Sequence, residues 1–162
     1  MRKVVVNSTP LIVLGNLGQL MLLRELYGEI YIPQAVYQEV TTLHDKASDS
    51  LKCNIEWIHV SSVQDDSQRK MYRAKLHAGE VEVMMMAQEM QGDVLTILDD
   101  NEAKKTAKYL GLRVTGTLGV LLKAKECGFL QEIAPLMRDM ENNGVFISAN
   151  VKEMVLEVAK EK

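Results

Sequence analysis

The chain has 162 residues, of which 47% are apolar and 25% charged, and these values are typical of one soluble globular domain. Its net charge of -3 argues against a protein that coats nucleic acid through a uniformly basic surface. We expect a single cytoplasmic domain over residues 1–162 with no membrane contact, because we find neither an apolar run of the ~20 residues that a bilayer requires nor a secretory signal.

The cysteines and histidines lack metal-binding spacing. Cys53 and Cys127 lie far apart without a CxxC partner, so we predict buried free thiols rather than a zinc site or a disulfide. The three histidines show no HxxxH or HExxH spacing, which makes a zinc site improbable.

The first half of the chain alternates between strand and helix patterns. Val4–Val6 predicts a strand, and Ser8-Thr9-Pro10 then begins a helix that extends to Gly28. The run 30–32 predicts a second strand, and Pro33 begins a helix through about Thr42. Residues 44–54 are polar and fit a loop or a weak helix.

A third strand is predicted at 55–60, and Ser61-Ser62 opens a polar helical stretch. Residues 79–91 are apolar around most of a helix, so this helix should be largely buried. The apolar run 94–98 predicts a strand covered on both faces. A helix to Gly111, a strand at 113–115 and a helix at 118–127 follow, with C-terminal helices from about 131. The alternation predicts an α/β fold with a doubly wound parallel sheet.

Polar side chains follow two of these strands. Asp99 and Asp100 come directly after the strand 94–98, and Asn7 ends the first strand. The carboxyl ends of parallel strands meet at one edge of the sheet, where α/β proteins bind ligands. Either aspartate could instead simply cap the helix that follows.

Glutamates on apolar helix faces extend this acidic set. Glu39 lies beside the buried stripe of its helix, and Glu80 and Glu82 share stripes with apolar residues. A carboxylate on an apolar helix face lowers the stability of the fold unless it is paired, exposed at the helix end or bound to a metal. Glu80 and Glu82 could also simply stabilise the first turn of their helix through its dipole.

Four segments together resemble a PIN domain: VVVNSTPLI, VYQEV, GEVEVMMMA, and ILDDNEAKKTA followed by GTLGVLLKAKECG. The match runs from about Val4 to Gly128. It is similar to the branch of solitary prokaryotic PIN proteins that are related to the toxin ribonucleases of toxin–antitoxin pairs.

The resemblance implies a three-layer α/β/α fold whose acidic side chains bind Mg²⁺ or Mn²⁺ and hydrolyse phosphodiester bonds in single-stranded RNA. Asn7 stands where the family usually has its first aspartate, and Glu39 matches the glutamate of the second helix. Glu80 or Glu82 matches the acid of the central helix, and Asp99 or Asp100 the acid after strand four. Asn7 supplies no negative charge, so the metal should bind less tightly than in relatives with an aspartate.

The same resemblance suggests roles for individual side chains. Glu80 or Glu82 and the two aspartates would bind the metal, Glu39 would bind it through water or act as general base, and Asn7 would position a metal-bound water. The candidate contacts to nucleic acid are Ser8, Lys104, Lys105, Thr115 and Thr117. For Thr117 a helix-capping role is the simpler interpretation, and for the two lysines a solvated helix face is.

Two other functions fit less well. A metal site weakened at Asn7 would suit a PIN-like module that binds nucleic acid or protein without catalysis. A nucleotide-binding or phosphatase protein is disfavoured because neither GxxxxGK[ST] nor a DxD after the first strand is present. We also expect a homodimer, supported by Met84–Met86 or the terminal helices if they are exposed, and the resemblance allows for a small antitoxin-like partner.

Overall fold

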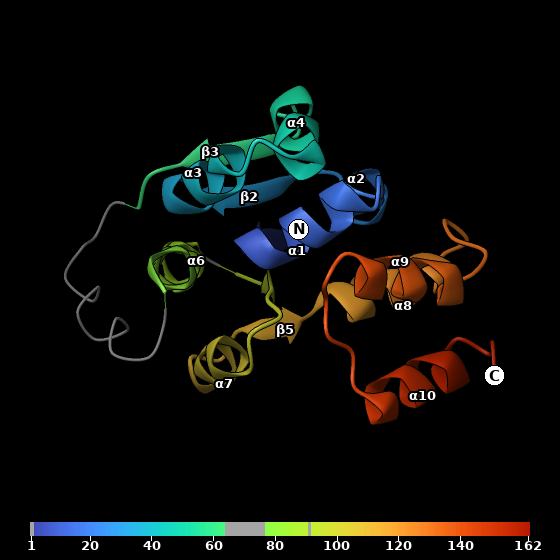
Figure 1. The fold of residues 1–162 in the computed structure, drawn as a ribbon. Coiled ribbons are helices and arrows are strands. Elements are labelled where there is room, and N and C mark those ends of the chain that lie inside the picture. Colours follow the sequence, from blue (N-terminus) through green and yellow to red (C-terminus); the bar gives the residue numbers. More distant parts are fainter. Residues whose placement is uncertain (1, 64–76, 91) are drawn as a thin grey trace.

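The computed structural model describes residues 2–63, 77–90 and 92–162. Five parallel strands form one sheet in the order β3-β2-β1-β4-β5 (Figure 1). Their bounds are β1 Lys3–Val6, β2 Ile30–Pro33, β3 Ile58–Ser61, β4 Val94–Ile97 and β5 Arg113–Thr115. The central pair is in register from Lys3 opposite Val94 to Val6 opposite Ile97. The predicted parallel sheet is confirmed.

The strand order reverses between β1 and β4. The chain runs outward from β1 to β2 and β3, and then returns to place β4 and β5 on the other side of β1. Because crossovers between parallel strands are right-handed, the helices that connect the strands of the first half and those that lead to β4 and β5 cover opposite faces, and the fold is the predicted three-layer α/β/α. The carboxyl ends of β1 and β4 therefore flank a switch point, where open α/β sheets form their ligand-binding crevice.

The helices of the first half are α1 Ser8–Asn16, α2 Met21–Tyr27, α3 Gln34–Thr42 and α4 Lys46–Cys53. The prediction of one helix from Ser8 to Gly28 was wrong. Gly18 has a φ of +72°, and the amide of Gln19 donates to the carbonyl of Leu14, which ends the first helix in a left-handed turn. Gly28, with a φ of +79°, ends α2 as expected.

Residues 44–54, which were predicted to form a loop or a weak helix, contain α4. Asp45 caps this helix by accepting a hydrogen bond from the amide of Ser48 at 3.0 Å. Strand β3 starts three residues later than predicted, and Ile55 is exposed. The polar helical stretch predicted after Ser61-Ser62 falls mostly on residues 64–76, outside the described residues.

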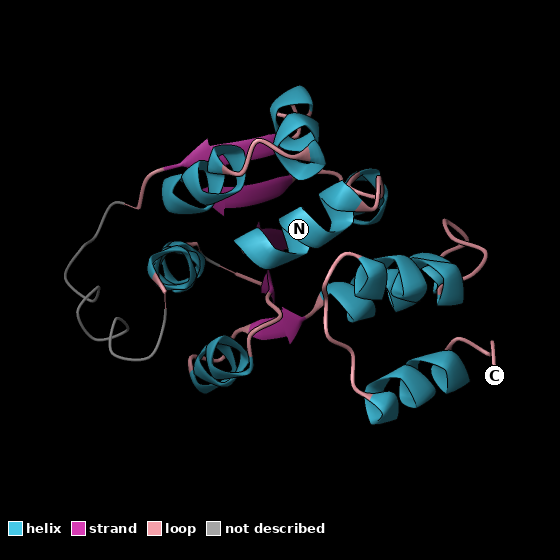
Figure 2. Ribbon diagram, viewed as in Figure 1, coloured by secondary structure: helices cyan, strands magenta, loops and turns pink. Residues whose placement is uncertain are grey.

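The second half follows the predicted order. Its helices are α6 Ala78–Glu89, α7 Asn101–Tyr109, α8 Thr117–Glu126, α9 Ala134–Asn142 and α10 Ala149–Val158. Helix α6 packs against β1, β2 and β4, and α10 lies against α8 (Figures 1 and 2). In each strand-helix unit the helix begins at the carboxyl edge of the sheet, so α1, α3, α7 and α8 all begin there.

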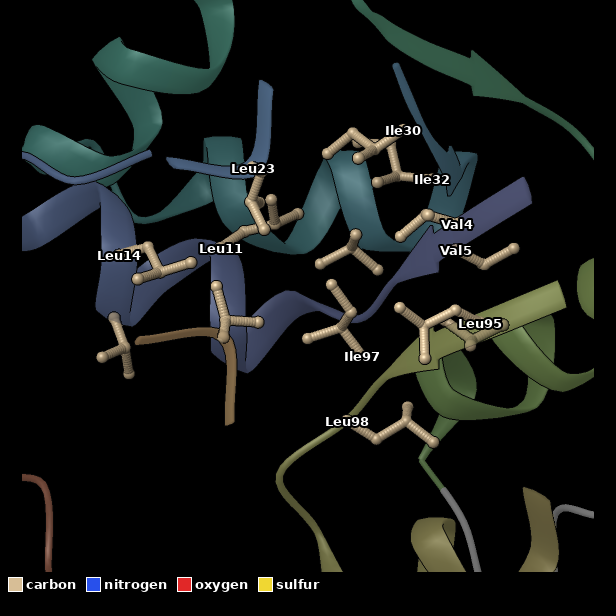
Figure 3. Close-up of a cluster of buried hydrophobic side chains, with 14 of the residues drawn as sticks. Val4, Val5, Leu11, Leu14, Leu23, Ile30, Ile32, Leu95, Ile97 and Leu98 are labelled. Carbon is tan, nitrogen blue, oxygen red and sulfur yellow. The ribbon is translucent and has the colours of Figure 1, made fainter. Parts of the chain in front are cut away.

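The core lies between the central strands and the helices, where side chains from β1, β2 and β4 meet those of α1 and α2 (Figure 3). The methionines of α6 belong to this core, as the all-round apolar pattern indicates. The expectation of buried thiols was wrong, because Cys53 and Cys127 are both exposed near helix ends. No helix in the described part of the chain is long and apolar enough to cross a membrane.

Candidate active site at the carboxyl edge of the sheet

Asn7 lies at the switch point. Its backbone amide donates to the carbonyl of Ile97 at 3.0 Å, which extends the β1–β4 pairing by one residue. Asn7 occupies the N-cap position of α1, but its side chain makes no capping bond. Its Oδ1 atom is buried and accepts no hydrogen bond from the residues that the structure describes. Buried polar atoms are rarely left unpaired, so this oxygen is a candidate ligand atom.

Glu39 of α3 faces the same place as Asn7. A Cβ atom added at Gly79 would lie 3.7 Å from Asn7 Oδ1 and 4.0 Å from Glu39 Oε1. Two side-chain oxygens from β1 and α3 thus approach the first turn of α6. Gly79 leaves the space between them open because it has no side chain.

Glu80, the next residue of α6, is the buried acid of the site, with only 6% of its surface exposed. Its Oε1 accepts a hydrogen bond from the amide of His77 at 3.0 Å. Burial raises the pKa of Glu80 above its usual range, and the negative charges of Asp100 and Glu39 raise it further, although the His77 hydrogen bond and the positive field of His77 oppose them. Glu39, Glu80 and Asp100 therefore share one electrostatic environment.

Asp100 and Asp99 have different roles although they are neighbours. Asp100 caps α7, with Oδ2 accepting from the amide of Ala103 at 2.9 Å, and it remains exposed at the crevice. Asp99 instead accepts from Thr117 twice, from the amide at 2.8 Å and from the hydroxyl at 2.6 Å. Asp100 is thus both a cap and a member of the acidic crevice, whereas both oxygens of Asp99 bind the start of α8.

Glu82 faces the start of α3, where its Oε1 accepts from the amide of Ala35 at 3.3 Å. Of the two glutamates left open by the sequence, Glu80 is the one whose pKa responds to the charges of Asp100 and Glu39. Within residues 2–63, 77–90 and 92–162, no three His, Cys, Asp or Glu side chains come close enough to hold a metal ion. Asn7 and Glu39 approach Gly79, and the charges of Glu39 and Asp100 act on Glu80. The acidic crevice is the part of the carboxyl edge of the sheet that carries Asn7, Glu39, Glu80 and Asp100. Glu82 and Asp99 instead bind helix N-termini.

The residues predicted to contact nucleic acid also differ in where their side chains lie. Ser8 is buried, and the buried Thr117 donates to Asp99. The residue at the N-cap of α8 is Gly116, so the capping role expected for Thr117 was wrong. Thr115 packs against α8, because a Cβ at Gly119 would lie only 2.2 Å from its Oγ1. Lys105 Nζ lies 3.8 Å from Glu102 Oε1 on the exposed face of α7.

Lys104, like Thr117, lines a groove. The groove has a volume of about 590 Å³ and begins at Asp99. One wall comes from the first turns of α1, α7 and α8, and the other from α9 and the segment between α9 and α10. The sequence analysis missed this second wall. No periodic pattern in the sequence connects Phe146 to Lys104.

The residues present fit a divalent cation. Mg²⁺ and Mn²⁺ prefer carboxylate and carbonyl oxygens, and this edge of the sheet offers the buried, unpartnered amide oxygen of Asn7 together with the carboxylates of Glu80 and Asp100, whose charges interact. A cation there would pair with Asn7 Oδ1 and relieve the repulsion between the carboxylates. These side chains carry one negative charge fewer than they would with an aspartate at position 7.

The doubly wound parallel sheet, with polar side chains at its switch point, defines an α/β protein of the kind that binds a ligand at the carboxyl edge. A sequence profile of the family described as PIN domain matches residues 3–161, nearly the whole chain. The chain therefore belongs to the PIN domain family, whose members generally use divalent metals. A search of curated proteins finds no match.

Proposed function

We propose that this protein is a metal-dependent ribonuclease that hydrolyses phosphodiester bonds in single-stranded RNA. The observation that carries the proposal is the unpartnered Oδ1 of Asn7, which is buried at the switch point near the first turn of α6. Membership in the PIN family supports the same activity.

Glu80, Asp100 and Asn7 would hold the metal ion, which when bound polarises the scissile phosphate and activates water. Glu80 is held by the amide of His77, and Asp100 by the amide of Ala103, so each carboxylate is fixed through one oxygen and keeps the other for a ligand. Such fixed oxygens lose little conformational entropy on binding.

Glu39 would act as the general base. It is exposed at the rim of the crevice, and its Oε1 approaches the first turn of α6. From there it can accept a proton from the attacking water and release it to solvent. Glu82 and Asp99 would support the site by fixing the first turns of α3 and α8.

The test is cleavage of a labelled single-stranded RNA with Mn²⁺, with Mg²⁺ and with EDTA. We expect cleavage only with metal, and a loss of at least about 100-fold in rate for Glu80→Gln. The control is Glu153→Gln, an exposed glutamate paired with Lys162 on the C-terminal helix. Wild-type protein that leaves RNA intact at saturating Mn²⁺ would contradict the proposal.

A second candidate is a PIN-like module that binds nucleic acid or protein without cleaving it. It is favoured by the neutral residue at position 7 and by the lack of a three-residue metal cluster among the described side chains. Titration calorimetry separates the two functions, because the non-catalytic module would bind RNA but take up no Mn²⁺ at Glu80.

We also propose a homodimer formed through α10. Met84–Met86 give no support, because all three are buried in the core. Met154 and Val158 of α10 are 55% and 62% exposed and lie one helical turn apart, so they present an apolar face. Light scattering should report a dimer, and Met154→Lys should yield a monomer. A small antitoxin-like partner stays a prediction of the sequence resemblance.

A further inference from the structure

The groove beside the acidic crevice has the position of a neighbouring subsite. It begins at Asp99, and the next residue, Asp100, belongs to the crevice itself. One wall comes from the first turns of α1, α7 and α8 and the other from α9 and the segment after it, so the groove lies between the carboxyl edge of the sheet and the C-terminal helices. Its volume of about 590 Å³ lies in the range of pockets that enclose one small ligand.

Lys104 supplies a positive charge to this groove. Its Nζ and Asp99 Oδ1 approach the same point, because a Cβ added at Gly116 would lie 3.1 Å from the first and 2.8 Å from the second. Asp99 is already bonded twice to Thr117, and no carboxylate in the described ranges lies within ion-pair distance of Lys104. The ammonium group can therefore pair with an anion in the groove.

Phe146 supplies an aromatic surface on the opposite wall. It is 89% exposed, yet it lies between Val145 and Ile147, which pack toward the core. An aromatic ring that is held by a packed segment but open to solvent gives a base a face on which to stack. The remaining lining offers hydrogen-bonding side chains from Thr9, Asn101 and Ser148.

We propose that this groove binds one nucleotide of a single-stranded RNA, next to the phosphodiester at the acidic crevice. Lys104 pairs with the phosphate of that nucleotide, and Phe146 stacks on its base. The inference rests on the proposed ribonuclease function, and it explains why the RNA substrate would be single-stranded. Bases in a duplex are stacked on one another and cannot reach an aromatic side chain in this way.

The test is fluorescence anisotropy with a labelled single-stranded RNA of about ten nucleotides, which is within the site sizes of such proteins, in EDTA so that binding is measured without cleavage. We expect Phe146→Ala to raise Kd by about 5- to 100-fold, which corresponds to the loss of one stacked base. Lys104→Gln should raise Kd and reduce the slope of log K against log salt by about 0.7, the contribution of one phosphate contact. Phe146→Ala should leave that slope unchanged.

Matched controls come from the far end of α7. Tyr109 has the same exposure as Phe146, 89%, but lies at the opposite edge of the sheet, and Lys108 precedes it. Tyr109→Ala and Lys108→Gln should leave Kd unchanged. An RNA with one abasic position completes the test, because the wild type should lose affinity at that position and Phe146→Ala should not.

The outcomes separate this inference from the ribonuclease proposal. RNA that is cleaved with Mn²⁺ while Phe146→Ala and Tyr109→Ala bind it equally would overturn the subsite and leave the ribonuclease standing. Affinity that depends on Phe146 and Lys104 without any cleavage would support the subsite and contradict the ribonuclease. A wild type that binds no RNA, or that binds a duplex of the same sequence with equal affinity, would overturn the subsite.

Discussion

Asp99 accepts both a backbone and a side-chain hydrogen bond from Thr117, whereas Asp100 accepts one bond from Ala103 within its own helix. Two adjacent aspartates of one motif thus have separate roles. Asp99 joins the end of β4 to the start of α8, and Asp100 keeps one oxygen for the crevice.

Asparagine substitutions should separate these two roles. Asp99→Asn loses one of the two oxygen acceptors, so the free energy of unfolding should fall by about 1–3 kcal/mol. Asp100→Asn should change it by less than about 0.5 kcal/mol, because asparagine caps helices about as well as aspartate. The Mn²⁺ affinity of the Asp100→Asn variant should fall, because a negative charge is removed from the crevice. Urea unfolding and calorimetry measure the two effects, and the opposite pattern would contradict these roles.

Gly116 is required by the approach of Asp99. A Cβ atom there would lie 2.8 Å from Asp99 Oδ1 and 3.3 Å from the carbonyl oxygen of Leu98. Gly116→Ala should therefore force the β4–α7 connection to shift and lower the free energy of unfolding by about 1–3 kcal/mol. Urea unfolding checks this, and an unchanged midpoint would show that the connection adjusts freely.

Gly79→Ala should behave in the opposite way. Its Cβ would make ordinary contacts, 3.5 Å from Val36 and 3.7 Å from Asn7 Oδ1, and alanine is favoured over glycine in helices by up to about 1 kcal/mol. The protein should become more stable. The new methyl group would occupy the space between Asn7 and Glu39, so Mn²⁺ affinity and RNA cleavage should fall. Equal or higher activity in the stabilised variant would argue against a ligand between these residues.

The strands and most helices could be predicted because apolar spacing reports which face of an element is buried. The break between α1 and α2 could not, since it depends on Gly18 adopting a positive φ within an apolar helical pattern. The sequence placed the acids at the correct edge but could not choose between neighbours. Glu80 accepts a hydrogen bond from the amide of His77, whereas Glu82 accepts one from the amide of Ala35 in α3. Only the packing of distant segments determines which of the two glutamates makes which contact.

The groove shows a second limit of the sequence. Lys104 could be named because it follows the paired aspartates on a helix. Phe146 could not, because its partners across the groove lie at least 28 residues away along the chain, and no periodic pattern connects them.

Glu161 should make stability depend on pH. Burial raises its pKa, but hydrogen bonds from Lys125, Ala134 and Ile133 lower it by more, so the pKa is below the ordinary value of 4.5. A carboxylate with a depressed pKa stabilises the fold above its unfolded pKa, and this contribution is lost as the pH falls through the folded pKa. Glu161→Gln should thus cost about 1–3 kcal/mol at pH 7, and the difference from wild type should shrink below about pH 4.5.

Urea unfolding across that range measures the effect of Glu161. The control is again Glu153→Gln, because the pair of Glu153 with Lys162 is exposed and such pairs contribute less than about 1 kcal/mol. A cost that stays constant from pH 7 to pH 3 would mean that the charge of Glu161 does not stabilise the C-terminal helices.

Asn7→Asp tests the candidate metal centre directly. Without metal, a carboxylate at this buried position would repel Glu80 and Asp100, so the free energy of unfolding in EDTA should fall by about 1–3 kcal/mol. With Mn²⁺ the added charge becomes a ligand, so the affinity for the ion should rise by about tenfold or more and stability should recover. Thermal unfolding in EDTA and in a Mn²⁺ series measures both changes, and RNA cleavage should increase with them. Asn143→Asp, an exposed position at the end of α9, controls for the extra charge. If Mn²⁺ raises the Tm of wild type and Asn7→Asp equally, the ion does not bind at residue 7.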